Sequence, residues 1–185
     1  MRILVAGASG VLGRATLPHL ERYDVVGLTR TPDRLDLIHA LGAEAHVCDV
    51  YDYPALLALT EGARPQIVVN FLTDLAGGSE QPNNRIRREG AANVLQAATA
   101  AGAGRLVVES VAFPLAGDTA RAVEQLERET RQFPGEGLIL RFGRLWGPGT
   151  FHERPPEPPS VEIGKAGAEA AQLITDARPG TYIVT

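Results

Sequence analysis

The sequence predicts an α/β protein, a single compact domain built on a doubly wound parallel sheet. Two observations support this prediction. Short apolar runs alternate with amphipathic or alanine-rich stretches through most of the 185 residues, and the apolar residues within runs such as 2–6 and 66–71 are consecutive and do not alternate with polar ones. Alternating strands and helices are typical of parallel βαβ units with right-handed crossovers. Unbroken apolar strands are typical of a sheet that is covered on both faces.

Six strands are expected, most of them from runs rich in Val, Ile and Leu, at 2–6, 24–29, 44–48, 66–71, 105–110 and 137–142. Five helices are expected between them, at 11–22, 33–41, 54–61, 83–102 and 118–132. The first helix would direct Val11, Leu12 and Leu20 toward a core. The fourth is alanine-rich, which favours a helix, and the fifth is expected to be a polar helix.

The pattern changes after residue 142, because glycine and proline crowd the segment 143–163. Proline lacks an amide donor and restricts its neighbour, so we expect an extended loop there. Beyond it, 164–176 favours a helix and 181–185 a last strand. We therefore divide the chain into a main domain, 1–142, the Gly/Pro-rich loop, and a C-terminal helix and strand, 164–185, that complete the sheet.

Composition and charge exclude several classes of protein. The net charge is −4 with no basic run, so nothing favours nucleic acid as a partner. No apolar run approaches the ~20 residues needed to cross a bilayer, and the first one reaches Gly7 too soon for a signal peptide. Cys48 is the only cysteine, which excludes an internal disulfide and a multi-cysteine metal site. We expect a cytoplasmic protein with no membrane partner and no metal.

A glycine-rich turn joins the first expected strand to the first expected helix, with the sequence Gly7-Ala8-Ser9-Gly10-Val11-Leu12-Gly13. Gly7 permits a tight turn, Gly10 lets the backbone approach a pyrophosphate, and Gly13 allows close packing of the helix. Free amides at the start of the helix attract phosphate. This context predicts a dinucleotide site that includes Gly7, Ser9, Gly10, Val11, Leu12 and Gly13. The alternative is a tight turn with no ligand.

The GxxGxxG spacing resembles the short-chain dehydrogenase/reductase superfamily, in its extended or atypical branch of epimerase/dehydratase-like proteins. Three further segments are similar to that group: 90–98 to its GTxNLLxAA helix, 141–149 to its LRxxxxYGPG segment, and 180–184 to its GxYNV end. The resemblance implies a Rossmann fold in which 1–142 binds the dinucleotide and 164–185 is the remnant of a substrate domain. It also allows a homodimer that pairs the fourth and fifth expected helices.

The resemblance implies further cofactor contacts. Asp49 and Val50 lie at the acidic turn that contacts adenine in the family. Asn70, Phe71 and Leu72 end the strand that lies beside the cofactor in the family.

The end of the second expected strand indicates which cofactor binds. An NAD site needs a carboxylate there for the ribose 2′-hydroxyl, but this strand is followed by Arg30, with Arg34 one turn later. A guanidinium suits the 2′-phosphate of NADP, because it makes charge-assisted and often bidentate contacts. We therefore predict NADP. NAD is the alternative if Asp33 turns toward the site and Arg30 is a solvated surface cation.

The pair of residues that carries the family's chemistry is absent. A YxxxK motif supplies a tyrosine as general acid/base and a lysine that lowers its pKa, because a tyrosine of pKa ~10 needs such help at neutral pH. The single lysine is Lys165, and none of the 4 tyrosines has a lysine four residues later. Alignment of the family's helix glutamate with Glu124 or Glu127 puts Ala116 and Ala120, or Thr119 and Val123, at the two positions.

Other candidates for the chemistry lie near the expected site. Ser110 ends the fifth expected strand, where the family often has a substrate-orienting serine, and is the catalytic candidate; the alternative is a small residue bonded to backbone. Glu109 is a weaker acid/base candidate, for which a salt bridge or a solvent-facing position is favoured. The basic segment 84–89 suits an anionic substrate, but a solvated helix face is favoured.

Two functions follow from these observations. The first is an atypical NADP-dependent oxidoreductase or isomerase on a small substrate, with proton transfer from Ser110, water or a loop residue. The second is a non-catalytic NADP(H)-binding sensor or partner subunit, which the absent Tyr–Lys pair favours. A fold that binds no cofactor is a third reading, and the glycines at 10 and 13 argue against it.

Overall fold

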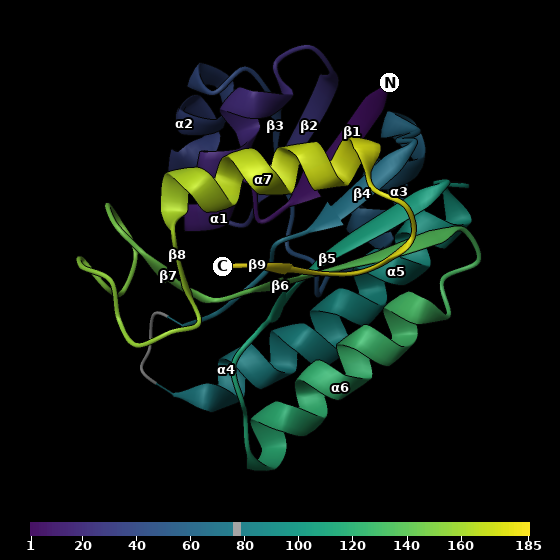
Figure 1. Ribbon diagram of the computed structural model, residues 1–185. Helices are drawn as coiled ribbons and strands as arrows, with labels where there is room; N and C mark the ends of the chain where they lie inside the picture. The colour runs from purple at the N-terminus through teal and green to yellow at the C-terminus, as the bar shows by residue number, and fades with distance from the viewer. Residues whose placement is uncertain (76–78) are drawn as a thin grey trace.

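Seven parallel strands form the central sheet of the computed structural model, which describes residues 1–75 and 79–185 (Figure 1). The strands are β1 (Arg2–Ala6), β2 (Asp24–Thr29), β3 (Glu44–Val47), β4 (Ile67–Asn70), β5 (Arg105–Val111), β6 (Glu136–Phe142) and β9 (Gly180–Val184). Their order across the sheet is β3-β2-β1-β4-β5-β6-β9. The first six follow the doubly wound order, in which the direction of winding reverses beside β1. The predicted fold class is therefore confirmed.

Helices cover both faces of this sheet (Figure 1). They are α1 (Val11–Thr16), α2 (Leu35–Ala40), α3 (Tyr53–Ala63), α4 (Glu80–Arg85), α5 (Ala91–Ala100), α6 (Gly117–Arg131) and α7 (Ile163–Asp176). Apolar side chains of α1, α2 and α7 form one core with one face of the sheet, and those of α3, α5 and α6 form a second core with the other. In the part of the chain that the structure describes, no helix has both the length and the apolar character to span a bilayer.

The C-terminal helix and strand return to the sheet. β9 pairs in parallel with β6, and α7 lies across α1 (Figure 1). The two helices approach closely because Gly167 has no side chain: a Cβ at this position would overlap the backbone carbonyl of Ala15. This packing places α7 in the same helical layer as α1, on one face of the sheet.

Two of the expected helices begin or end in tighter turns. The expected helix at 11–22 divides into α1 and a 3-10 turn, Leu17–Leu20. Pro18 stands at the start of that turn, and it has no N–H to donate to the carbonyl four residues earlier. The expected helix at 33–41 likewise begins with a 3-10 turn, Pro32–Arg34, before α2.

Two other segments differ more from expectation. The expected helix at 83–102 is α4, a π turn at Ile86–Gly90 and then α5. Part of the expected loop at 143–163 forms two short strands, β7 (Arg144–Trp146) and β8 (Ser160–Glu162), which pair in parallel with each other. The pairing of these strands brings the two ends of the proline-rich segment together.

A buried carboxylate on α6 joins this helix to two strands. Glu127 accepts hydrogen bonds from Ser110 Oγ of β5 (2.7 Å), from Arg141 of β6 (2.7 and 2.6 Å) and from Arg131 on its own helix (2.7 Å). Burial alone would raise the pKa of Glu127, but the hydrogen bonds from Arg141, Ser110 and Arg131 outweigh it and lower the pKa to about 2. The Glu127 carboxyl group is therefore ionised at neutral pH, and its hydrogen bonds fix the position of α6 against β5 and β6.

Glu127→Gln is expected to lower the free energy of unfolding at pH 7 by roughly 2–3 kcal/mol. This loss is smaller than that for a fully buried ion pair, because Arg131 and Arg141 stay partly hydrated. The pKa of Glu127 is about 2 when folded and about 4.3 when unfolded. Its contribution is thus fully present above the unfolded pKa and is lost as the pH falls toward the folded one.

Urea unfolding at pH 7 and pH 3 measures this effect. The difference between wild type and variant should shrink at pH 3. Glu124→Gln, on the exposed face of the same helix, is the matched control and should be neutral. Equal effects of the two substitutions, or a difference that grows at pH 3, would contradict the assignment.

Candidate functional site

The glycine-rich turn lies between β1 and α1 and is closed by a hydrogen bond from the Gly10 amide to the Gly7 carbonyl (3.0 Å). Gly7 has φ +87°, and a Cβ there would lie 2.7 Å from the carbonyl oxygen of Phe71 at the end of β4. A Cβ at Gly13 would overlap the carbonyl oxygens of Gly7 and Ala8. The turn therefore needs both glycines for its own packing, and the first turn of α1 lies directly against it.

A first cavity of about 150 Å³ lies over this turn, at the carboxyl ends of β1, β2 and β4. It brings together most of the residues predicted to contact a dinucleotide, namely Gly7, Ser9, Gly10, Arg30, Asp49, Val50, Phe71 and Leu72. Segments far apart in the chain thus meet at one edge of the sheet, as expected for ligand sites in open α/β folds.

The other predicted cofactor residues lie outside the first cavity. Val11 and Leu12 line a second cavity instead, and Gly13 packs behind the turn. Asn70 is buried, and its side-chain oxygen accepts a hydrogen bond from the Leu72 amide (3.1 Å). Asn70 thus shapes the chain after β4 and does not line either cavity.

The charged group at the end of β2 is Arg30. Its Nη1 lies 3.1 Å from the carboxylate of Asp74, with the arginine 60% exposed and the aspartate 19% exposed. Arg30, Thr31 and Asp74 all line the first cavity, whereas Asp33 is exposed outside the lining. Asp74 was not foreseen from the sequence, because it comes from the segment that follows β4.

A second cavity of about 500 Å³ lies beyond the carboxyl ends of β5 and β6. It shares Gly10, Phe71 and Thr73 with the first cavity, so the two adjoin. Most of its wall is apolar and includes Val11, Leu12, Phe71, Val111, Phe113, Leu115, Phe142 and Leu145. A cavity of this size with a mostly apolar surface is typical of small-molecule sites.

The strand β5 contributes adjacent residues with different environments. Ser110 forms part of the cavity wall but is fully buried, and its hydroxyl is donated to Glu127. Its predicted catalytic role stays a prediction. Glu109 is partly buried in the wall of the same cavity and, within the described residues, forms no ion pair. Burial raises the pKa of Glu109 to about 7, although the charge of Arg87 acts to lower it. The salt bridge, one of the two positions favoured from the sequence, is not formed among the described residues, and the side chain is only partly exposed.

The basic segment at 84–89 is not a uniformly solvated helix face, which corrects the favoured expectation. Arg85 is exposed, stacks on Tyr51 with 4.2 Å to the ring centroid and pairs with Glu89 (2.8 Å). Arg87 is only 5% exposed and lines the second cavity. Among the described residues, its Nε and Nη1 have no hydrogen-bond partner.

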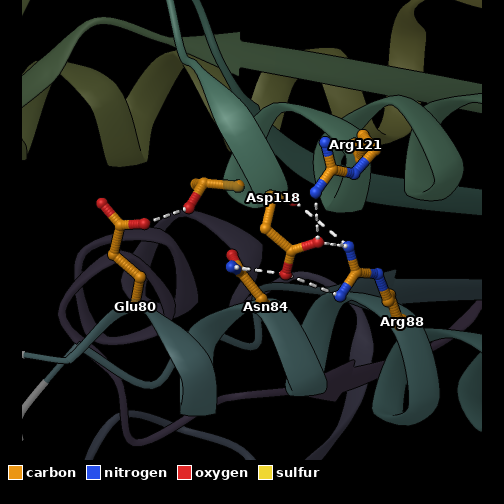
Figure 2. A network of polar contacts seen from close by, with 6 residues as sticks. Glu80, Asn84, Arg88, Asp118 and Arg121 are labelled. Atoms are coloured by element: carbon orange, nitrogen blue, oxygen red, sulfur yellow. Dashed lines mark hydrogen bonds and ion pairs between the residues drawn. The ribbon is translucent and has the colours of Figure 1, made fainter.

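A polar network holds this segment against the start of α6 (Figure 2). Asp118 accepts hydrogen bonds from Arg88 (2.6 and 2.9 Å), Asn84 (3.2 Å) and Arg121 (3.1 Å). The hydrogen bond from Arg88 is the main cause that lowers the pKa of Asp118 to about 2, and the one from Arg121 adds to it. The network ties α4 and the π turn to α6, and so fixes the turn that carries Arg87.

Thr119 belongs to the same network and to the second cavity. Its hydroxyl donates to Glu80 (2.7 Å), and both residues line the cavity. In the alignment based on Glu127, Thr119 takes the position of the family's tyrosine and the buried Val123 that of its lysine. A hydroxyl is therefore present near the tyrosine position, but no ammonium group accompanies it.

A model of the NAD dependent epimerase/dehydratase family matches residues 3–134. A relative from a Streptomyces species, a 3-diazoavenalumate denitrifying reductase, is 36% identical over 184 aligned residues that cover 83% of this chain. The chain spans 59% of the length of that relative.

Solved structures share the fold at low identity. They include the Bordetella bronchiseptica enzyme WbmG in complex with NAD (TM-score 0.80, 19% identity, 100% of this chain and 72% of that one). They also include the Thermus thermophilus UDP-glucose 4-epimerase in complex with NAD (TM-score 0.81, 16% identity, 100% of this chain and 77% of that one). By the family match over most of its length, the chain belongs to the NAD dependent epimerase/dehydratase family.

Proposed function

We propose that the protein is an NADP(H)-dependent oxidoreductase that reduces a small, largely apolar substrate. The observation that carries this proposal is that the two cavities adjoin through Gly10, Phe71 and Thr73. A dinucleotide on the glycine-rich turn would extend from the first cavity toward the second. When bound, the cofactor supplies or accepts a hydride, and the second cavity would hold the other reactant.

The residues around the first cavity fit NADP better than NAD. An NAD site requires a carboxylate at the end of β2 for the ribose 2′-hydroxyl. Arg30 and Thr31 line the cavity at that point, and Asp33 lies outside it. The guanidinium of Arg30 suits a 2′-phosphate. A bound 2′-phosphate would compete with the Asp74 carboxylate for this guanidinium.

The supply of protons limits which substrates this site can reduce. Carbonyl reduction needs a proton as well as a hydride, and the tyrosine that provides it in the family is absent. Glu109 is a carboxyl group of raised pKa in the wall of the second cavity. Because its pKa of about 7 matches the working range of a general acid, Glu109 is our candidate proton donor.

The Streptomyces relative supports reduction in preference to isomerisation, because it is named a denitrifying reductase of a diazo compound. An aryl diazonium ion that accepts hydride becomes an arene and releases N2 (Ar–N2⁺ + H⁻ → Ar–H + N2). That reaction consumes no proton and so does not require the Tyr–Lys pair. Aryl diazo compounds are therefore included among the acceptors that we propose.

A second candidate function is a non-catalytic NADP(H)-binding sensor or partner subunit. The absence of the Tyr–Lys pair favours it. A sensor would bind NADPH and NADP⁺ with different affinities and would turn over no acceptor. Titration with both redox forms beside an acceptor panel separates it from the reductase.

Arg30→Ala is expected to weaken NADP⁺ binding roughly tenfold and to leave NAD⁺ binding nearly unchanged, because a charge-assisted contact to the 2′-phosphate is lost. Asp74→Asn should tighten NADP⁺ binding, since Arg30 loses its internal partner. Calorimetric titration measures both. Arg34→Ala, one turn away and outside the cavity lining, is the matched control. An equal loss for both cofactors in Arg30→Ala would count against the NADP assignment.

Glu109→Gln is expected to lower NADPH-dependent reduction of aryl aldehydes by at least ~100-fold, the usual scale of general acid catalysis. A general acid works in its protonated form, so the wild-type rate should fall as the pH rises through about 7, the pKa of Glu109. In the variant, the rate should not fall as the pH rises through this range. Steady-state rates between pH 5 and pH 9 measure the effect.

Two controls accompany this measurement. Reduction of an aryl diazonium salt, followed against a reaction without protein, needs no proton and should be nearly unaffected in Glu109→Gln. Glu80→Gln changes an exposed carboxylate of the same cavity, and its rate should still fall as the pH rises through about 7, the pKa of Glu109. If Glu109→Gln slows both acceptors equally, or slows neither, Glu109 is not the proton donor.

A further inference from the structure

We propose that Arg87 binds a carboxylate of the substrate, so that the second cavity takes a small organic acid with an aromatic or otherwise apolar body. The inference deepens the proposed function, because it assumes that the second cavity is the substrate site. It rests on the burial of Arg87, on the absence of a partner for it among the described residues and on the shape and lining of the cavity.

A buried guanidinium without hydrogen-bond acceptors is unfavourable, so proteins normally pair it. Arg87 is 5% exposed, and its Nε and Nη1 find no acceptor in the described part of the chain. The pKa of Arg87 is lowered by this burial, although the charge of Glu109 acts in the opposite sense. Nε and Nη1 lie on different edges of the planar guanidinium, and each forms a two-donor edge, or fork, with Nη2, so a carboxylate could match either edge with two acceptor oxygens.

The acidic groups nearby do not neutralise Arg87 in the described structure. Asp118 is bound by Arg88 and Arg121. Glu109 lines the same cavity, but the two side chains form no ion pair within 4.0 Å. Because the pKa of Glu109 is about 7, Glu109 can take up a proton and become neutral when an anion binds to Arg87.

The position of Arg87 depends on the π turn. The turn is wide because the Ala91 amide donates to the carbonyl of Ile86, five residues earlier. Gly90 packs so closely that a Cβ there would lie 2.8 Å from the side chain of Ile86. With Arg88 tied to Asp118 (Figure 2), the turn directs the preceding residue toward the cavity. Such π turns are often found at functional sites.

The rest of the cavity favours an apolar body on the acid. Phe71, Phe113 and Phe142 contribute aromatic rings to its wall. The other arginine in the wall, Arg144, stacks on Phe113 with 4.6 Å to the ring centroid and donates to the Glu157 carbonyl (3.3 Å). Its donors are thus partly occupied, which leaves Arg87 as the cation suited to a ligand.

The same fork would also suit a phosphate of the cofactor, because the second cavity includes Gly10 of the glycine-rich turn. The shared chemistry is an oxyanion beside a guanidinium. The experiment therefore measures the affinities for cofactor and for carboxylate separately. The probes are trans-cinnamate and cinnamamide, which differ in the presence of the negative charge.

Calorimetric titrations of the full chain, free and saturated with NADP⁺, test the proposal. Wild type should bind trans-cinnamate at least tenfold more tightly than cinnamamide. Arg87→Met should weaken cinnamate binding by roughly 10- to 100-fold, the scale of a lost charged hydrogen-bond pair, and leave cinnamamide binding nearly unchanged. Arg87→Lys keeps a charge without the fork and should be intermediate. Arg85→Met removes an exposed charge from the same segment and should keep the preference.

Three results would overturn the proposal. In the first, wild type shows no preference for the carboxylate, including no binding of either probe. In the second, the preference survives in Arg87→Met and Arg87→Lys, both checked for folding by circular dichroism. In the third, Arg87→Met weakens NADP⁺ binding alone, which would assign the fork to a cofactor phosphate. Failure of NADP⁺ to bind wild type would instead count against the proposed function, while the carboxylate preference of the free protein still decides this inference.

Discussion

The close approach of the glycine-rich turn to the end of β4 is the constraint on which the site depends. Any Cβ at Gly7 would stand 2.7 Å from the Phe71 carbonyl oxygen, so the two strands can separate only beyond this point. After it, α1 packs on one face of the sheet and α5 on the other. A crevice therefore opens at the carboxyl edge, where open α/β sheets bind their ligands. Both cavities lie in it.

Charged groups in and around this crevice fall into two kinds. Glu127 and Asp118 are fully engaged by arginines, and they fix α6 and the π turn against the sheet. Arg87 and Glu109 face the second cavity without such partners among the described residues. Perturbed ionisable groups that line a cleft are candidates for a functional site. The paired groups supply rigidity, and the unpaired ones are available to a ligand.

The strands and the glycine-rich turn were predictable because their signals are local. An unbroken apolar run or a spacing of glycines needs no knowledge of distant residues, and most strand boundaries agree within one residue. The π turn and the burial of Arg87 could not be predicted in this way. They depend on Asp118, which is 30 residues from Arg88 in the chain. The sequence therefore indicates a basic segment without revealing which of its arginines turns inward.

Other parts of the site were missed for related reasons. Glu109 and Ser110 are neighbours on β5, and the alternation of a strand does not say which face meets a cavity. Both residues line the second cavity, but Ser110 donates its hydroxyl to Glu127, whereas Glu109 forms no ion pair among the described residues. The strands β7 and β8 are three residues each and pair only with one another within the main elements described, so neither carries a strong signal of its own.

A crystal structure of the complex with NADP⁺ tests the central claim most directly. The account predicts that the pyrophosphate lies on the turn from Gly7 to Gly13 and that the 2′-phosphate meets Arg30. The nicotinamide should open into the second cavity, within reach of a substrate held between Arg87 and Glu109. A nicotinamide that points away from this cavity, or a cofactor bound elsewhere on the protein, would contradict it.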